Sequence, residues 1–357
     1  MTALLTVEHL TKTYTTKGGL FGRGATARVV SDVSFTLARG DTFAIVGESG
    51  SGKSTIGRML MRLIEPDSGV IRFDGIDITT LAAAQMRRLR RRIQIIFQDP
   101  FGSLDPRVRI GEAIAEPIRL HRLRPPDAIR ERVSELLALV GLDAGHAGRY
   151  PHEFSGGQRQ RVAIARALAV EPELIVCDEP VSALDLSVQA QVVNLLADLR
   201  DRLGVSYVFI SHDMAVVRHL ASHVGVLYAG RLVETGPAET VFADPRHPYT
   251  RMLLAATPSP APHAARARAA IVGEPPSPFA TADQCRFASR CGHRIDLCLT
   301  AQPPLVEIAP PPRKTACLLS AELQPFLALS DGEAMMSDAY RRRLGLLRRA
   351  RAAEGRP

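Results

Sequence analysis

The sequence predicts an α/β fold with a mainly parallel β-sheet covered by helices on both faces. Two observations predict it: short apolar strands alternate with helical segments, and a glycine-rich phosphate-binding loop joins one such strand to a helix. The chain has 357 residues, of which 46% are hydrophobic and 23% charged, so disordered and disulfide-scaffold classes are excluded for its bulk. No apolar run approaches the roughly 18 residues of a membrane helix. Because the first residues also lack a signal-peptide pattern, we expect a cytosolic chain.

The predicted elements can be followed along the chain. Strand patterns cover residues 6–10, 29–37 and 42–46, and a glycine-rich loop at 17–24 separates the first two. Apolar spacing predicts a helix over 55–65, and residues 99–165 are mostly helical but interrupted by prolines. Buried strands are expected at 174–177 and 206–210. Beyond about residue 255, a proline-rich linker leads to a cysteine cluster and then to an Arg-rich tail, with a helix expected over 340–351.

The net charge of +8 allows contact with nucleic acid or anionic lipid but is too small to indicate either. The densest basic run covers residues 87–92. We interpret it as a solvated helix face, because no aromatic side chains interleave with it to stack bases. No nucleic-acid partner is therefore expected.

A phosphate-binding motif occupies residues 47–54, which match G-x-x-x-x-G-K-[ST] between a strand and a helix. Its glycines let successive backbone N–H groups point inward as an anion nest, and the helix N-terminus adds its dipole. Lys53 supplies a point charge to the β- and γ-phosphates, and the Ser54 hydroxyl can ligate Mg²⁺. The predicted nucleotide contacts are Gly47, Glu48, Ser49, Gly50, Ser51, Gly52, Lys53, Ser54 and Thr55.

Two carboxylates, Asp178 and Glu179, follow the apolar strand at 174–177. By itself this pattern is as often structural as functional, but here it follows a phosphate-binding loop. Asp178 is placed to hold Mg²⁺ through water, and Glu179 to polarise the attacking water.

A second anion nest consists of Ser155, Gly156, Gly157 and Gln158 at the start of an apolar helix. One phosphate loop and a second nest in the same chain suggest that the nest serves a nucleotide bound by a partner chain. Standing alone, the motif would be interpreted as a helix cap.

In this order, the motifs resemble an ABC transporter ATPase subunit over roughly residues 4–255. The resemblance implies a P-loop NTPase fold with a RecA-like core, an antiparallel β subdomain and a helical subdomain at about 99–165. It also implies binding of ATP and Mg²⁺ and hydrolysis of ATP. It further implies four residue roles: adenine stacking by Tyr14, Mg²⁺ sensing by Gln98, a loop across the dimer interface at Asp185, and γ-phosphate contact by His212.

Three features resemble the ATPase subunits of oligopeptide and dipeptide importers: the insertion at 17–24, the segment 247–254, and an extension at 256–322. This resemblance implies a peripheral subunit on the cytoplasmic face of the membrane that powers import of peptides or related solutes. The implied partners are two transmembrane permease subunits, a second and different ATPase subunit and, indirectly, a substrate-binding protein. An exporter ATPase and a non-transport ATPase acting on nucleic acid stay as alternatives. The tail at 323–357 lies outside the resemblance.

The small C-terminal Cys-rich extension contains Cys285, Cys291, Cys298 and Cys317. In a reducing cytosol such a cluster favours a metal site over disulfides, and a small domain with little apolar content often needs a metal to fold. The paired Cys-x₂₋₄-Cys spacing of structural zinc is absent, whereas iron–sulfur clusters accept four cysteines at varied spacing. Importer ATPases with similar extensions carry a four-iron–four-sulfur (4Fe–4S) cluster, so the resemblance favours that cluster over zinc or reduced packing cysteines. We expect a structural role, because nothing in the sequence places the cluster near the nucleotide.

Overall fold

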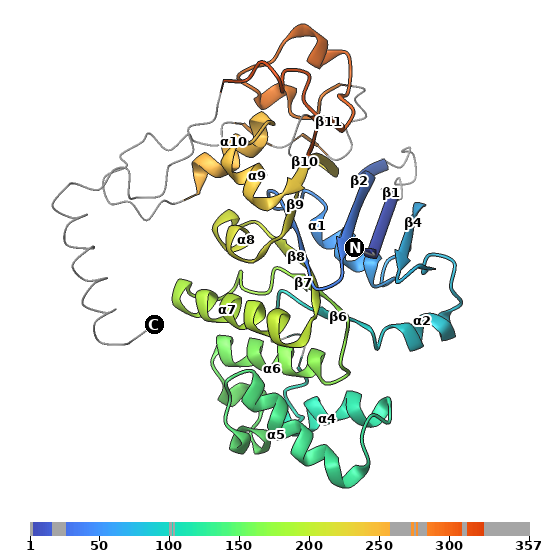
Figure 1. The fold of residues 1–357 in the computed structure, drawn as a ribbon, viewed down its shortest axis with the longest axis vertical. Coiled ribbons are helices and arrows are strands. Elements are labelled where there is room, and N and C mark those ends of the chain that lie inside the picture. Colours follow the sequence, from blue (N-terminus) through green and yellow to red (C-terminus); the bar gives the residue numbers. More distant parts are fainter. Residues whose placement is uncertain are drawn as a thin grey trace, which may run out of the picture.

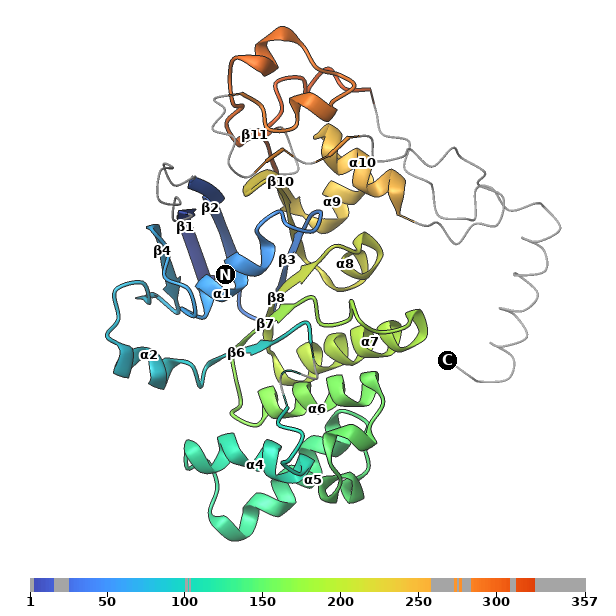
Figure 2. The ribbon, with the colours of Figure 1, turned by 180° about the vertical axis from the view of Figure 1, so that it is seen from behind.

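The computed structural model describes residues 3–15, 26–99, 102, 104–257, 273–274, 276–277, 284–308 and 313–324. Its framework is one large sheet, flanked by a smaller antiparallel sheet and by helices (Figure 1 and Figure 2). The loop predicted at 17–24, most of the linker after residue 257 and the tail helix predicted at 340–351 lie outside the described residues.

The large sheet contains the predicted parallel core. Its eight strands follow the order β11-β12-β10-β9-β3-β8-β7-β6, and the five from β9 to β6 are parallel to one another. β10 pairs antiparallel with β9, and two short strands of the cysteine-bearing extension continue the sheet beyond it. The bounds are β3 (Thr42–Val46), β6 (Ile93–Ile96), β7 (Leu174–Asp178), β8 (Ser206–Ser211), β9 (His223–Tyr228), β10 (Arg231–Pro237), β11 (Val306–Ile308) and β12 (Arg313–Thr315).

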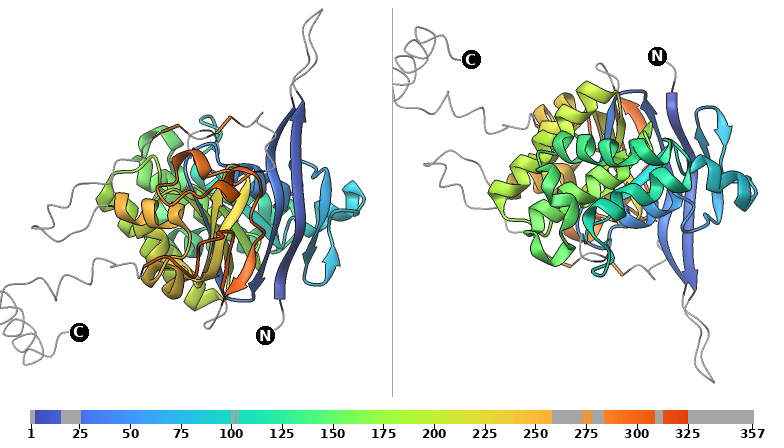
Figure 3. Two further views of the ribbon diagram at one scale, coloured as in Figure 1. Left: turned by 90° about the horizontal axis from the view of Figure 1, so that it is seen from above. Right: turned by 90° about the horizontal axis from the view of Figure 1, so that it is seen from below.

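A four-stranded antiparallel sheet stands beside the large one, as the views along the vertical axis show (Figure 3). Its order is β2-β1-β4-β5, with bounds β1 (Ala3–Thr15), β2 (Thr26–Ala38), β4 (Ser68–Phe73) and β5 (Ile76–Asp77). The strands predicted at 6–10 and 29–37 lie inside β1 and β2, which are longer than the patterns indicated.

Two hydrophobic cores lie on opposite faces of the large sheet. Along β3, Phe43 and Ile45 belong to the core shared with the antiparallel sheet, whereas Ala44 and Val46 belong to the core shared with most of the helices. Successive strand residues point to opposite faces, so a strand buried on both faces needs an uninterrupted apolar run. That requirement made β3, β7 and β8 recognisable in the sequence.

The helices flank the sheet, and α4, α5 and α6 form a lobe beyond its β6 end (Figure 1). The α-helices are α1 (Lys53–Leu60), α2 (Ala83–Leu89), α4 (Ile110–Leu120), α5 (Ile129–Leu139), α6 (Gly156–Leu168), α7 (Leu186–Leu203), α8 (Met214–Leu220), α9 (Ala238–Ala243) and α10 (Pro248–Ala256). Short 3₁₀ turns are η1 (Pro126–Ala128), η2 (Ala144–Gly148), η3 (Pro151–Glu153), η4 (Ala288–Arg290) and η5 (Asp296–Leu299).

The first helix is shorter than predicted. It was expected to reach residue 65, but α1 ends at Leu60, because Arg62 adopts a left-handed backbone with φ of 46°. The Leu63 N–H donates to the Arg58 carbonyl at 2.9 Å and closes this end.

The arginine run at 87–92 differs from the predicted solvated helix face. Arg87 and Arg88 are exposed on α2, as expected, but the helix ends at Leu89. Arg90 then folds back and donates to the Arg62 carbonyl at 3.0 Å, and Arg92 enters a network of ion pairs. The prediction fails for Arg90 and Arg92 because their partners lie far away in the sequence, where the local pattern cannot reveal them.

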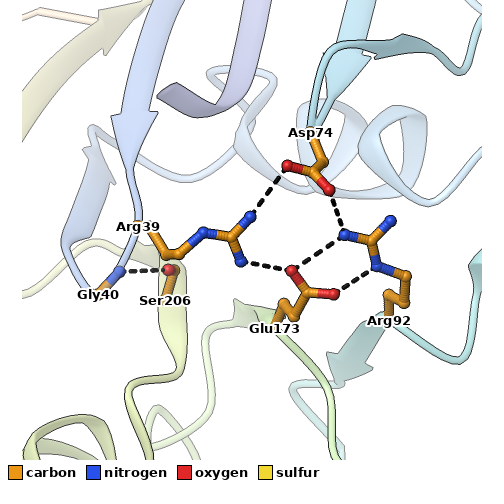
Figure 4. Close-up of polar contacts among 6 residues, drawn as sticks. All are labelled: Arg39, Gly40, Asp74, Arg92, Glu173 and Ser206. Atoms are coloured by element: carbon orange, nitrogen blue, oxygen red, sulfur yellow. Dashed lines mark hydrogen bonds and ion pairs between the residues drawn. The ribbon is translucent and has the colours of Figure 1, made fainter. Parts of the chain in front are cut away.

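That network joins the two sheets (Figure 4). Arg92 pairs with Asp74 and Glu173, and Arg39 pairs with the same two carboxylates, at 2.9 Å in the case of Asp74. Asp74 follows β4 of the antiparallel sheet, whereas Glu173 and Arg92 directly precede β7 and β6 of the large sheet. The network therefore ties the sheets together at the strand ends opposite the phosphate-binding loop.

Candidate active site

The phosphate-binding loop connects the end of β3 to the start of α1. Its first and last glycines are required sterically: a Cβ on Gly47 would lie 2.2 Å from the Leu227 carbonyl oxygen, and one on Gly52 would lie 2.5 Å from that of Val29. Gly52 also has a φ of 104°, which favours glycine. The loop is thus held closely against β9 and β2.

Lys53 provides the positive charge of the loop. Its side chain is 3% exposed, and its ammonium donates to the carbonyl oxygens of Gly47 at 2.8 Å and Glu48 at 2.9 Å. Burial lowers the pKa of Lys53, and nearby carboxylates oppose that shift. The buried Ser51 hydroxyl has no hydrogen-bond partner among the described residues. A phosphate would satisfy both groups.

Ser54 and Asp178 form an oxygen-rich pair beside the loop. The Ser54 hydroxyl donates to Asp178 Oδ1 at 2.7 Å and so links the start of α1 to the end of β7. Asp178 is 3% exposed, and burial raises its pKa while the Ser54 hydrogen bond opposes the rise. Hydroxyl and carboxylate oxygens are the ligand class that Mg²⁺ prefers.

Glu179 lies at the centre of the residues predicted to act in catalysis. Its Oε2 accepts a hydrogen bond from Gln98 Nε2 at 3.3 Å and lies 3.2 Å from His212 Nδ1, while Oε1 is 3.8 Å from Lys53 Nζ. The Glu179 side chain is only 13% exposed. Its backbone has a φ of 49°, and its N–H donates to the Ile210 carbonyl at 3.0 Å. Left-handed backbone at a non-glycine residue costs energy and is concentrated at functional sites.

The second anion nest lies at the start of α6. The Ser155 hydroxyl accepts from the Gln158 N–H at 3.3 Å, and the Gln158 side chain accepts from the Ser155 N–H at 3.0 Å. A Cβ on Gly157 would lie 2.2 Å from Val188 Cγ1, so this turn packs against the start of α7. Asp185 caps α7 by accepting from the Val188 N–H at 3.0 Å. The nest and the loop predicted to cross a dimer interface are therefore neighbours.

Other predicted nucleotide contacts lie at the surface. Tyr14 is 40% exposed on β1, and the Lys12 ammonium lies 5.7 Å from its ring centroid. Ser49 and Gly50 are exposed in the phosphate-binding loop, and Thr55 is half-buried on α1. All four positions are accessible to a ligand.

Comparison with known proteins places this site in a family. The model "ABC transporter" matches residues 30–182, and "Oligopeptide/dipeptide transporter, C-terminal region" matches residues 233–298. A putative peptide import ATP-binding protein of Brucella ovis is 52% identical over 87% of this chain and 96% of its own length. The dipeptide transport ATP-binding protein DppF of Escherichia coli is 46% identical over 85% of this chain and 90% of its own length. The chain belongs to the oligopeptide/dipeptide ABC transporter ATP-binding proteins.

Solved structures agree with this assignment. The ATP-binding cassette MJ0796, in a dimeric post-hydrolysis state bound to ADP and Pi, is 30% identical with a TM-score of 0.59, covering 66% of this chain and 98% of that one. cbiO1 of Clostridium perfringens, part of the transporter complex cbiONQ, is 30% identical with a TM-score of 0.58. The match covers 68% of this chain and 91% of cbiO1. The predicted ABC ATPase fold with its antiparallel β subdomain is confirmed.

Family membership makes this chain the ATPase subunit of a peptide-import ABC transporter, in which it binds ATP and couples its hydrolysis to transport. The matches favour this function over the exporter and nucleic-acid alternatives, because the C-terminal model and the similar relatives are described by peptide transport. Among the described residues, no helix combines the length and apolarity needed to span a membrane.

Two contacts of the phosphate-binding loop were not predicted. The Glu48 N–H donates to the Tyr249 hydroxyl at 2.9 Å, and Arg290 donates to both Glu48 carboxylate oxygens at 2.8 Å each. The importer-type segment 247–254 was a signal for Tyr249, but no local pattern pairs Arg290 with a residue 242 positions away. The cysteine-bearing extension therefore does reach the loop, which corrects the expectation that nothing places it near the nucleotide.

Proposed function

We propose that this chain supplies a hydrolysis-competent half-site in which Glu179 polarises the attacking water. The observation that carries the proposal is the convergence of Gln98, His212 and Lys53 on the Glu179 carboxylate. In this proposal Lys53 holds the β- and γ-phosphates. His212, which also lies beside the Glu179 carboxylate, contacts the γ-phosphate. A base held by fixed partners within reach of the phosphate site is suited to orient a water for in-line attack.

Replacing Glu179 by glutamine tests this role. The amide keeps the shape but removes the base, so ATP should still bind while turnover of the purified transporter falls about 10²- to 10⁴-fold. Lys53→Ala should instead weaken ATP binding itself. A matched control is Glu171→Gln, because Glu171 shares the positive φ, at 57°, but is exposed and lies outside the site. Near-normal hydrolysis by the Glu179→Gln transporter would contradict the assignment.

Mg²⁺ fits the oxygen atoms beside the loop. Ser54 and Asp178 would hold the ion, with Asp178 acting through water and Gln98 sensing it from the segment after β6. When bound, the ion neutralises charge on the β- and γ-phosphates. The 2.7 Å hydrogen bond between Ser54 and Asp178 supports this placement, because it already aligns both oxygens.

The chain would act as a peripheral subunit on the cytoplasmic face of the membrane. Its partners in this proposal are two transmembrane permease subunits, a second and different ATPase subunit and, indirectly, a substrate-binding protein. The position of the anion nest supports a partner ATPase: its cap hydrogen bonds stay within the start of α6, so further first-turn N–H groups are available to a nucleotide held by another chain.

The four cysteines of the extension would hold a 4Fe–4S cluster. Cys285, Cys291, Cys298 and Cys317 line one pocket, and Cys177 lies elsewhere, buried in β7. Burial raises the pKa of the Cys317 thiol to about 11, so a positively charged centre would be needed to keep it ionised. In the described part of the chain, no three His, Cys, Asp or Glu side chains converge to hold a single metal ion. The proposal of a cluster rather than zinc rests on spacing: the paired Cys-x₂₋₄-Cys pattern of structural zinc is absent, whereas iron–sulfur clusters accept four cysteines at varied spacing.

Metal content tests the cluster. The anaerobically purified chain should be brown and contain iron, and Cys291→Ser should remove both colour and iron. Cys177→Ala is the control, because that thiol lies outside the pocket and its loss should leave the iron in place. Zinc without iron would identify a zinc site, and protein with neither metal would leave only packing cysteines.

A further inference from the structure

Glu48, the second residue of the phosphate-binding loop, is held by two segments that also line the four-cysteine pocket. Its carboxylate contacts Arg290, the neighbour of Cys291, and its N–H contacts Tyr249, the second residue after His247. Both Cys291 and His247 line the pocket. The two contacts therefore reach one loop residue from the same side of the molecule.

The Arg290 contact is a two-point ion pair with a buried guanidinium. The Arg290 side chain is 2% exposed and the Glu48 side chain 18% exposed, and each terminal nitrogen of Arg290 lies 2.8 Å from a different Glu48 carboxylate oxygen. Arg290 closes the 3₁₀ turn η4, and its N–H donates to the Phe287 carbonyl at 3.0 Å. Paired guanidinium–carboxylate hydrogen bonds fix orientation as well as distance. The fold of the extension thus determines where this guanidinium lies.

The Tyr249 contact reinforces the same anchor. His247 is buried and accepts from the Tyr249 N–H through Nδ1 at 3.1 Å. The Tyr249 ring is fully buried and packs on Phe287 of the extension, with ring centroids 5.5 Å apart. A rigid aromatic contact of this kind limits movement between α10 and the extension.

The Glu48 carboxylate is in an unfavourable place unless it is paired. Glu48 directly follows Gly47, its backbone carbonyl accepts from Lys53 Nζ at 2.9 Å, and its negative charge acts to raise the pKa of Lys53. A free carboxylate there would repel a polyphosphate and compete for Lys53. Breaking a buried pair by removing one partner leaves the other charge uncompensated.

We propose that Arg290 is a positioning residue for nucleotide binding: by neutralising and orienting Glu48, it couples the shape of the phosphate-binding loop to the docked state of the cysteine-bearing extension. This inference rests on the proposed nucleotide site at Lys53. Arg290 acts through Glu48 and does not contact the phosphates.

A double-mutant cycle on the full-length chain tests this coupling. Arg290→Gln should weaken binding of a fluorescent ATP analogue about 10-fold, since a charge-assisted pair is lost and a carboxylate is left free. Glu48→Gln alone should have a much smaller effect. The double variant should bind better than Arg290→Gln alone, because the uncompensated charge is gone. A residue that only stabilised the fold would not show this recovery.

The control variant is Arg313→Gln. Arg313 is also buried and joins the extension to the core through an ion pair, 2.9 Å from the partly exposed Asp244, and among the described residues its hydrogen-bond partners do not include the phosphate-binding loop. It should lower the melting temperature without changing nucleotide affinity. For the Arg290→Gln variant, by contrast, ATP hydrolysis by the assembled transporter should show a raised KM for ATP and a nearly unchanged kcat.

The outcomes separate this inference from the proposed site. If Lys53→Ala abolishes binding while Arg290→Gln leaves it unchanged, the nucleotide site stands and the Arg290 role is overturned. Equal losses for Arg290→Gln and Arg313→Gln, with no recovery in the double variant, would also overturn it. If Arg290→Gln does not fold, Arg290→Lys takes its place, with a smaller loss that Glu48→Gln again restores.

Discussion

At the scale of single residues, the two adjacent carboxylates Asp178 and Glu179 have different surroundings. Asp178 is the last residue of β7, buried and hydrogen-bonded to Ser54. Glu179 leaves the strand with a φ of 49°, which turns its carboxylate towards Gln98 and His212. Two chemically similar side chains can therefore serve a metal and a water separately, because the backbone changes direction between them.

The first prediction concerns Asp178. Asp178→Asn removes a charge from the oxygen pair, so the affinity for ATP in the presence of Mg²⁺ should fall about 10-fold, the loss expected for one charge-assisted contact. Affinity in EDTA should stay unchanged. Titration with a fluorescent ATP analogue in the two buffers measures the difference. Asp201→Asn, at an exposed residue of α7, is the control. Equal affinities for the variant and the unmodified chain in Mg²⁺ would argue against a metal role.

At the scale of elements, the network of Arg39, Asp74, Arg92 and Glu173 connects the two sheets. The hydrogen bonds from Arg92, helped by Arg39 and opposed by burial, lower the pKa of Glu173 to about 2. An unfolded glutamate titrates near 4.3, so the folded chain favours the charged form. The stabilisation is complete above about pH 5 and is lost as the pH falls from about 4 towards 2.

The second prediction follows from that shift. Glu173→Gln should lower the free energy of unfolding by about 1 kcal/mol near neutral pH, because partial exposure screens the pairs. The difference from the unmodified chain should shrink below about pH 4, because Glu173 takes up a proton near pH 4 in the unfolded chain but only near pH 2 in the folded chain. Urea unfolding at several pH values measures it. Glu135→Gln, on an exposed pair of α5, should change little. A gap that stays constant down to pH 3 would contradict the network's role.

We expect coupling to the membrane subunits to involve the residues between Gln98 and α4. This segment begins at a residue that contacts Glu179 and continues through the exposed Arg107 and Arg109. Arg109 lies over the Tyr150 ring, 5.4 Å from its centroid, whereas Arg107 extends from a turn capped by Asp105. We expect a change at the nucleotide to be sensed by Gln98 and passed to this surface.

The third prediction tests that surface. Arg107→Glu should reduce transport or complex assembly more than it reduces ATP binding, because we expect this surface to dock on the permease and not to contact the nucleotide. Transport into vesicles and pull-down of the permeases measure the two effects. Arg88→Glu, an exposed arginine of α2, is the control. Cross-linking that finds residue 107 in solvent in the assembled transporter would contradict the docking.

At the scale of the whole molecule, the two predicted anion-binding features lie on different elements. The phosphate-binding loop and Glu179 lie at the ends of β3 and β7, while the nest at Ser155 begins α6 and packs against α7. The hydrogen bonds of the nest remain in its own cap. In the arrangement proposed above, the nest would contact a nucleotide held by a partner ATPase subunit.

The fourth prediction uses that separation. Ser155→Arg should leave ATP binding to the isolated chain unchanged, yet lower turnover of the assembled transporter about 10²-fold, the loss typical of a removed transition-state donor. Ser134→Arg, on α5 of the same lobe, is the control. Weakened ATP binding by the isolated Ser155→Arg chain would place the nest in the same half-site as Lys53 instead.

The sequence by itself determined the parallel core, the phosphate-binding loop, the two carboxylates and the nest. Each of these features is formed by residues adjacent in the sequence. A strand buried on both faces must be apolar throughout, and an anion nest must be built from neighbouring N–H groups. Only the tertiary structure decided that α1 ends at Leu60, that Arg92 is paired rather than solvated, and that Arg290 reaches Glu48. Long-range ion pairs leave no periodic pattern, since either partner alone resembles an ordinary surface charge, and their pairing depends on how separate elements pack.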